Sequence, residues 1–91
     1  MVIERFRNGD HRRVGERFRR EGRLMPDGVA CVASWLDPAG TVCFQITEAP
    51  DRAALDEWVR RWQDLVEFEV VEVEPSAAFW ARVNRSVERG S

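Results

Sequence analysis

The chain has no large surplus of charge of either sign. Its 91 residues carry 14 basic and 16 acidic side chains, which gives a formal net charge of −2 at pH 7. Binding to nucleic acid or to an anionic lipid surface depends on a surplus of positive charge. An arginine-rich segment over residues 12–23 is interrupted by Glu16 and Glu21, a pattern typical of a solvated helix face. We therefore expect no nucleic-acid partner and no membrane partner.

Long apolar runs and recognisable cysteine patterns are also missing. No apolar stretch approaches the roughly 20 residues of a membrane-spanning helix, and the first residues indicate a strand rather than a targeting segment. Cys31 and Cys43 match neither zinc-site spacing nor thioredoxin-like spacing. We expect a cytoplasmic protein with two free, buried thiols.

Motifs that hold phosphate, metal ions or an activated nucleophile are absent from the sequence. There is no Gly-rich phosphate loop, no nucleophile elbow and no cluster of residues at metal-ligand spacing. We therefore expect no cofactor and no metal. The sequence has no internal repeat and no low-complexity linker, and its length is that of one domain near the small end of what folds alone.

The order of hydrophobic periodicities is the most informative feature that the chain does have. Alternating stretches predict four strands, and stretches of helical period separate the first strand from the second and the third from the fourth. The order β-α-β-β-α-β predicts an α+β protein with the ferredoxin-like arrangement. Right-handed crossovers give a four-stranded antiparallel sheet in the order 4-1-3-2, with both long helices on one face. The strands are expected over residues 1–6, 29–36, 41–48 and 68–74.

Both long helices have recognisable ends. Asp10 is suited to cap the first helix, Gly22 to end it, and Asp51 to cap the second helix. Gly15 lies in the interior of the first helix, where glycine costs about 1 kcal/mol relative to alanine. We expect a spatial reason for this glycine, such as a close approach to the sheet or to a ligand.

The expected sheet has more apolar surface than helices on one face can cover. Apolar residues occupy both faces of the first, third and fourth strands. The same sheet face of a second copy is the economical cover, so we expect a homodimer that forms a dimeric α/β barrel. The alternative is a monomer in which a third helix covers that face. We divide the chain into a domain over residues 1–74 and a C-terminal helical extension over residues 75–91.

Several segments carry a family resemblance. They are MVIERFR, RRVGERFRREGRLMPDG, VASWLD, CFQITEA and, as the most specific, LDEWVRRWQDLVEFEVVEV, which together span about residues 1–74. They resemble an uncharacterised bacterial family, domain of unknown function 3303, which is similar to the dimeric α/β-barrel superfamily. That superfamily includes cofactor-free quinone-forming monooxygenases, haem-degrading monooxygenases, chlorite dismutase-like haem proteins and muconolactone isomerase-like enzymes. The immediate family has no assigned activity, so no catalytic residue is carried over.

The resemblance implies a pocket inside each protomer, between the sheet and the two long helices. The haem degraders carry a pocket asparagine on their first strand, and Glu4 takes that position here. Because the third strand neighbours the first, we expect Gln45 and Thr47 near Glu4. Partial desolvation would raise the pKa of Glu4 and suit it to act as a general base. The alternative is a carboxylate that pairs with an arginine or accepts hydrogen bonds.

His11 and three tryptophans complete the candidate site. His11, the single histidine, begins the first helix on its inward stripe and is either a hydrogen-bonding partner in the pocket or a helix-terminal residue with a structural role. Trp58 and Trp62 are core residues or walls of a cavity for a flat apolar ligand. Trp35 lies at the pocket mouth or in the dimer interface. The haem degraders have their histidine where this chain has tryptophan, so haem binding is not expected.

From the sequence we expect a small homodimeric protein that binds an apolar or aromatic small molecule without a cofactor. If it is an enzyme, the resemblance implies cofactor-independent oxygenation or isomerisation. Glu4 would then be the base, and Gln45 and His11 would donate hydrogen bonds to developing oxyanion charge. The ligand contacts would be Trp35, Thr47, Trp58 and Trp62. The alternative is a non-catalytic structural or protein-interaction module whose third helix docks a partner.

Overall fold

The computed structural model describes the backbone of residues 1–90 and the side chains of residues 1–85. Ser91, the last residue of the expected extension, lies outside the described residues. The elements follow the predicted order, with a short 3-10 turn after the first strand. They are β1 (Val2–Phe6), the 3-10 turn η1 (Arg7–Gly9), α1 (His11–Glu21), β2 (Ala30–Leu36), β3 (Val42–Glu48), α2 (Arg52–Trp62), β4 (Val66–Val70) and α3 (Ser76–Gly90).

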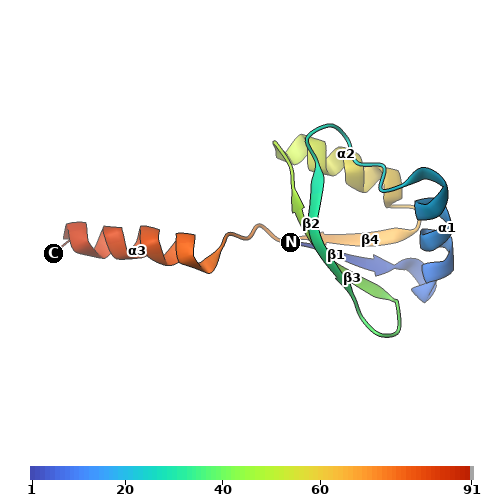
Figure 1. Cartoon of the computed structure of the whole chain (residues 1–91), viewed down its shortest axis with the longest axis horizontal. Coiled ribbons are helices and arrows are strands. Elements are labelled where there is room, and N and C mark those ends of the chain that lie inside the picture. The colour runs from blue at the N-terminus through green and yellow to red at the C-terminus, as the bar shows by residue number, and fades with distance from the viewer. Residues whose placement is uncertain (91) are drawn as a thin grey trace.

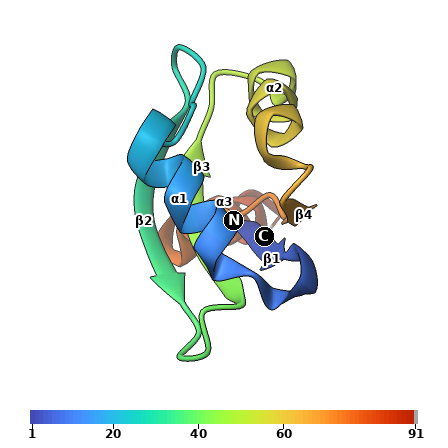
Figure 2. The ribbon, with the colours of Figure 1, turned by 90° about the vertical axis from the view of Figure 1, so that its right-hand side faces the viewer.

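The four strands form one antiparallel sheet in the order β2-β3-β1-β4. Counted from the other edge, this is the predicted order 4-1-3-2, so the ferredoxin-like α+β fold with its C-terminal helix is confirmed. The turn of the β2–β3 hairpin extends beyond the helices, as both ribbon views show (Figures 1 and 2). We call the face of the sheet toward α1 and α2 the inner face, and the opposite face the outer face.

Both helices begin where the sequence predicts, and α1 also ends where it predicts. The side chain of Asp10 accepts a hydrogen bond from the backbone N–H of Arg12 (3.1 Å), and that of Asp51 accepts one from Ala54 (2.8 Å). Gly22 ends α1 with a φ of 70°, a left-handed conformation that glycine adopts without steric cost. The caps satisfy N–H groups that have no partner inside the helix.

The core lies between the inner face of the sheet and α2. Its centre consists of Val2, Trp58, Trp62 and Val66, none of which is more than 5% exposed. α1 contributes no buried residue, so it covers the sheet less closely than α2 does. The space between sheet and helices is consequently well filled under α2 and open under α1.

One backbone carbonyl joins the loop after α1 to α2. The carbonyl oxygen of Arg23 accepts hydrogen bonds from the indole N–H groups of Trp58 (3.0 Å) and Trp62 (2.8 Å). The next carbonyl, of Leu24, accepts one from the guanidinium of Arg61 (2.9 Å). Leu24 has a φ of 56°, which few non-glycine residues adopt. These bonds hold the loop against α2 in a fixed conformation.

The fourth strand begins and ends earlier than the predicted residues 68–74. Val66 fits the helical period of α2, but α2 ends at Trp62 and Val66 is the first, buried residue of β4. At the other end, the N–H of Val71 donates to the carbonyl of Met1 (2.8 Å). Because the neighbouring strand β1 starts at Val2, the residues that follow Val71 have no strand beside them.

A β-bulge interrupts β2. Cys31 lies opposite Thr47, whereas Ala33 lies opposite Ile46, so β2 holds one more residue than β3 over this stretch. The additional residue is Val32. An extra residue reverses the alternation of side chains in the rest of the strand. Before the bulge, odd-numbered residues of β2 such as Cys31 face inward; after it, even-numbered residues face inward.

The bulge turns Trp35 away from the helices. Regular alternation from Cys31 would place Trp35 on the inner face. Instead, Ser34 and Leu36 lie on that face, and Trp35 is opposite Phe44 on the outer face. The sequence of β2 contains no glycine or proline from which the bulge could be predicted.

α3 extends away from the sheet at the end of an extended segment (Figure 1). Arg82 of α3 binds Glu74 of that segment through two hydrogen bonds (2.9 and 2.7 Å), and Trp80 is 58% exposed. The helix leaves the outer face of the sheet uncovered. The arrangement in which the third helix covers this face of its own chain is therefore not the one observed.

Candidate functional site

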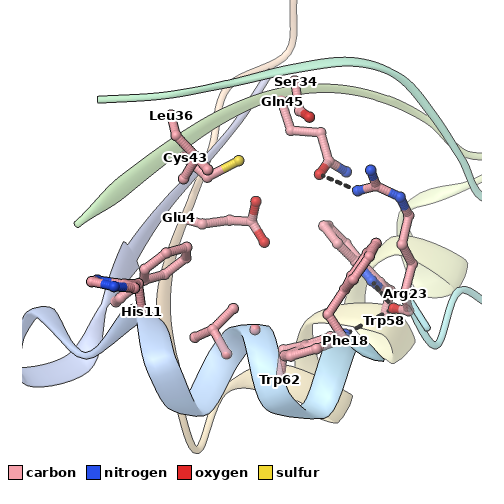
Figure 3. Close-up of a pocket in the computed structure, with 13 residues that line it drawn as sticks. Glu4, His11, Phe18, Arg23, Ser34, Leu36, Cys43, Gln45, Trp58 and Trp62 are labelled. Atoms are coloured by element: carbon pink, nitrogen blue, oxygen red, sulfur yellow. Dashed lines mark hydrogen bonds between the residues drawn. The ribbon is translucent and has the colours of Figure 1, made fainter. Parts of the chain in front are cut away.

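A cavity of about 360 Å³ lies between the inner face of the sheet and the helices α1 and α2 (Figure 3). Small-molecule sites have volumes of roughly 300–1,000 Å³. Three strands, both helices and the loop after α1 contribute side chains. They are Glu4, Phe6, His11, Val14, Gly15, Phe18, Arg23, Ser34, Leu36, Cys43, Gln45, Trp58 and Trp62.

Aromatic and aliphatic side chains form most of the cavity wall. Trp58 and Trp62 are held by their indole hydrogen bonds to the loop, and Trp58 packs edge-on against Phe68 with ring centroids 5.5 Å apart. Phe18 completes this side from α1. The aromatic wall is thus fixed by hydrogen bonds and ring packing and does not depend on a ligand for its position.

Glu4 reaches into the cavity from β1 (Figure 3). It lies opposite Cys43 of β3 and next to Phe68 of β4 in the sheet. Burial raises the pKa of the Glu4 carboxyl, while a hydrogen bond with Cys43 and the positive charge of Arg23 partly oppose that shift. The cavity therefore favours the neutral form of Glu4 more than water does.

The two cysteines are free, and Cys43 is not set up as a nucleophile. Burial, and then the nearby charge of Glu4, raises the pKa of the Cys43 thiol to about 12. A thiol with so high a pKa stays protonated near neutral pH and is unreactive. Cys31 is half-buried rather than buried, contrary to the expectation for both thiols. Cys43 serves as a hydrogen-bonding neighbour of Glu4.

Gln45 is the most buried polar side chain of the site, with 1% of its surface exposed. Its Nε2 donates to the Oγ1 of Thr47 (2.7 Å), and its Oε1 accepts from the guanidinium of Arg23 (3.4 Å). Thr47 thus holds the amide of Gln45 in place but does not itself line the cavity. Gln45 lies opposite Val2 in the sheet, so Cys43, rather than Thr47, is the residue opposite Glu4.

His11 and Gly15 line the cavity from α1. His11 is exposed and lies against Gly40 in the β2–β3 turn, where a Cβ added to the glycine would be 3.4 Å from the histidine Nδ1. A Cβ added to Gly15 would meet no atom within 4 Å. Close packing against the sheet therefore does not require a glycine here, and the space beside it is open.

The cavity brings together most of the residues that the sequence singles out, but not all. Glu4, His11, Gln45, Trp58 and Trp62 line it. Trp35 does not, because the bulge in β2 turns its side chain to the outer face.

Sequence reasoning missed Arg23, which it grouped with the solvated arginines of the first helix. Gly22 could have separated Arg23 from those arginines, because it marks the end of the helix. A residue beyond the end of a helix does not share that helix's outer face. Phe18 and Ser34 also line the cavity without having been singled out.

Within the side chains that the structure describes, no three His, Cys, Asp or Glu residues gather closely enough to hold a metal ion. None of the helices among the described residues has the length and apolar character needed to cross a membrane.

The comparison with protein families gives a match over almost the whole chain. The family model described as Domain of unknown function (DUF3303) matches residues 1–87. The matched range includes most of α3 and so extends past the segments that carry the resemblance in the sequence. No curated protein and no solved structure matches the chain.

Substitution of Glu4 by glutamine tests the cost of burying its carboxyl group. The pKa of Glu4 is raised in the folded state, so the folded protein binds more protons than the unfolded chain between the two pKa values. Its free energy of unfolding therefore falls as pH rises through that window. We expect Glu4→Gln to be more stable than the wild type at pH 7 and to lose this pH dependence.

Urea unfolding from about pH 4 to pH 8 measures the difference, and the two proteins should converge at the acidic end. Glu48→Gln, which alters an exposed carboxyl at the end of β3, is the matched control and should follow the wild-type profile. A Glu4→Gln variant that is less stable than the wild type at pH 7 would contradict the expectation.

Proposed function

We propose a function for this chain, which belongs to the family described as Domain of unknown function (DUF3303): it binds an apolar or aromatic small molecule in the cavity between the sheet and helices α1 and α2. The observation that carries this proposal is the cavity itself. It combines an apolar, largely aromatic wall with a few polar side chains that converge from β1, β3 and the loop after α1. Protein interiors are otherwise close-packed, with few voids larger than a water molecule.

Gly15 supports the binding function. Alanine in its place would stabilise the helix by about 1 kcal/mol. An added Cβ would meet no neighbour, so packing does not require a glycine there. The glycine instead leaves room inside the cavity, which is what a bound ligand needs.

Filling the cavity from Gly15 tests the binding function. We expect Gly15→Leu to abolish binding of a flat aromatic probe, 2-naphthamide, because the leucine side chain occupies the space beside α1. Gly15→Ala is the graded comparison; its single added carbon should weaken binding less than leucine does, and it should gain up to about 1 kcal/mol of stability. Isothermal titration calorimetry measures binding, and thermal unfolding shows that both variants fold.

Binding of the probe by Gly15→Leu with wild-type affinity would place the probe elsewhere and refute the cavity as its site. A folded wild type that binds no aromatic probe would favour the alternative function, a non-catalytic module that docks a partner through the exposed face of α3.

Glu4 supports a second candidate function at the same site, isomerisation by proton transfer. A carboxyl group whose pKa is raised by burial is suited to remove a proton from an activated carbon. Return of that proton to another position of the same molecule completes an isomerisation without a further reactant. Cofactor-independent oxygenation, which consumes O₂, is the related reaction that the family resemblance implies.

Exchange of the acidic C–H protons of 2-tetralone in D₂O tests this second candidate. We expect the wild type to accelerate exchange and Glu4→Gln to lose the acceleration, while Glu48→Gln retains it, because the amide cannot accept the proton. Proton NMR measures the exchange rate. Equal acceleration by wild type and Glu4→Gln would remove Glu4 from the reaction.

The outer face of the sheet supports a homodimer. Trp35 is 58% exposed and Phe44 is 40% exposed, and they lie opposite each other in the β2–β3 half of the sheet. The β1–β4 half instead carries an ion pair between Arg5 and Glu69 (2.9 Å). An exposed apolar patch of this kind marks a contact surface, and a two-fold axis covers the patches of both copies with one contact. We therefore propose a second copy of the chain as the partner of the β2–β3 half.

Introduction of a charge into this patch tests the homodimer. We expect the wild type to have twice the 10.5 kDa mass of one chain at micromolar concentration, and Phe44→Glu to be monomeric, because burial of the new carboxylate would be costly. Sedimentation equilibrium measures both masses. Arg19→Glu, on the exposed side of α1, is the control and should remain dimeric. A monomeric wild type would contradict the proposal.

A further inference from the structure

Arg23 places a cation on the wall of the cavity (Figure 3). Its backbone carbonyl is fixed by the indole groups of Trp58 and Trp62, and its guanidinium lies over the ring of Phe18, with 5.2 Å between the guanidinium carbon and the ring centroid. The side chain is therefore positioned both by its own backbone and by the aromatic ring beneath it. It is exposed on its other side, so a group bound there would keep part of its hydration.

The guanidinium of Arg23 has donors to spare. A guanidinium carries five N–H groups, in a planar fork that fits a carboxylate through two parallel hydrogen bonds. Within residues 1–85, the hydrogen-bond partner of Arg23 is the amide oxygen of Gln45, at a long 3.4 Å. Arg17 provides the contrast, since it binds both carboxylate oxygens of Asp64 at 2.8 and 2.6 Å. Among residues 1–85, no carboxylate occupies the fork of Arg23, which can therefore receive one from a ligand.

The charged groups of the cavity include one guanidinium that can pair with an anion. The lining includes one carboxyl group, that of Glu4, and burial favours the neutral form of that group. The thiol of Cys43 stays protonated, and His11 lies at the mouth next to the hairpin turn. The guanidinium of Arg23 is the cation of this lining that an anionic ligand can reach, and its charge also acts on Glu4.

We propose that the ligand of this cavity is a small aromatic acid: its ring lies against the aromatic wall formed by Phe18, Trp58 and Trp62, and its carboxylate is held by the guanidinium of Arg23. This inference rests on the proposed binding function, because it names the chemical class of the ligand for the same cavity. Gln45, held in place by Thr47, lies beside the carboxylate and keeps the guanidinium turned toward the sheet. The carboxylate remains near water while the ring is buried.

Three probes of the same shape test the ligand class. They are 2-naphthoate, which is anionic, 2-naphthamide, which is neutral, and 2-naphthylmethylammonium, which is cationic. We expect the wild type to bind 2-naphthoate at least about tenfold more tightly than 2-naphthamide, since the carboxylate accepts two charge-assisted hydrogen bonds. Titration calorimetry of the full chain gives the dissociation constants.

Variants of Arg23 show whether the preference comes from this side chain. Arg23→Gln should lose the preference for the acid, so that acid and amide bind with similar affinity, and Arg23→Lys should keep part of the preference because the charge is retained. Arg19→Gln removes an exposed arginine of α1 outside the cavity and should behave as the wild type. The backbone carbonyl that holds the tryptophans is present in all variants, and near-UV circular dichroism verifies their fold.

The possible outcomes separate this inference from the function on which it rests. Equal affinity of the wild type for acid and amide, or tighter binding of the ammonium probe, would overturn the aromatic-acid inference and leave the binding function standing. A preference for the acid that survives in Arg23→Gln would also overturn it, since another group would then hold the carboxylate. A wild type that binds none of the three probes would contradict the binding function itself.

Discussion

The site depends on a single carbonyl oxygen, that of Arg23, at which the indole N–H groups of Trp58 and Trp62 meet. A buried indole N–H that loses its partner has a free-energy cost of about 1–3 kcal/mol, and here two such groups share one acceptor. The loop after α1 therefore cannot leave α2 without unpairing both tryptophans. The same bond fixes the aromatic wall of the cavity and places the side chain of Arg23 on it. The hydrogen bonds to this backbone carbonyl thus position both the aromatic wall and the charge of Arg23, without a ligand.

The cavity exists because the two helices contribute unequally to the core. α2 buries Trp58 and Trp62 against the sheet, whereas α1 buries no residue. In the middle of α1, Gly15 adjoins open space. An amphipathic helix with a fuller apolar stripe would settle onto the sheet and close that space. The polar groups of Glu4 and Gln45 lie on the part of the sheet that α1 leaves open. Thin packing under one helix and polar side chains on the facing strands are two aspects of the same arrangement.

The sequence was sufficient to predict what local chemistry determines. Asp10 and Asp51 mark helix starts because a carboxylate can satisfy free backbone N–H groups, and the alternation in β3 sets Cys43 and Gln45 on the inner face. The order of periodicities gave the strand order, and the family resemblance implied the pocket position of Glu4. They could not reach features decided by long-range contacts. Arg23 acquires its place only when α2 supplies two indoles from elsewhere in the chain, and the extra residue in β2 appears only against the register of β3.

The bulge in β2 links two surfaces that would otherwise be independent. Pairing without the bulge would shift residues 33–36 by one position along β3, bring Trp35 into the cavity, and send Ser34 and Leu36 outward. The register of β3 against β1, and with it Glu4 and Gln45, would stay as it is. A shift of one residue in the register of β2 would thus narrow the cavity and remove the largest apolar side chain from the outer face in one step. In such a sheet, the shape of the inner cavity and the apolar area of the outer face depend together on the register of one edge strand.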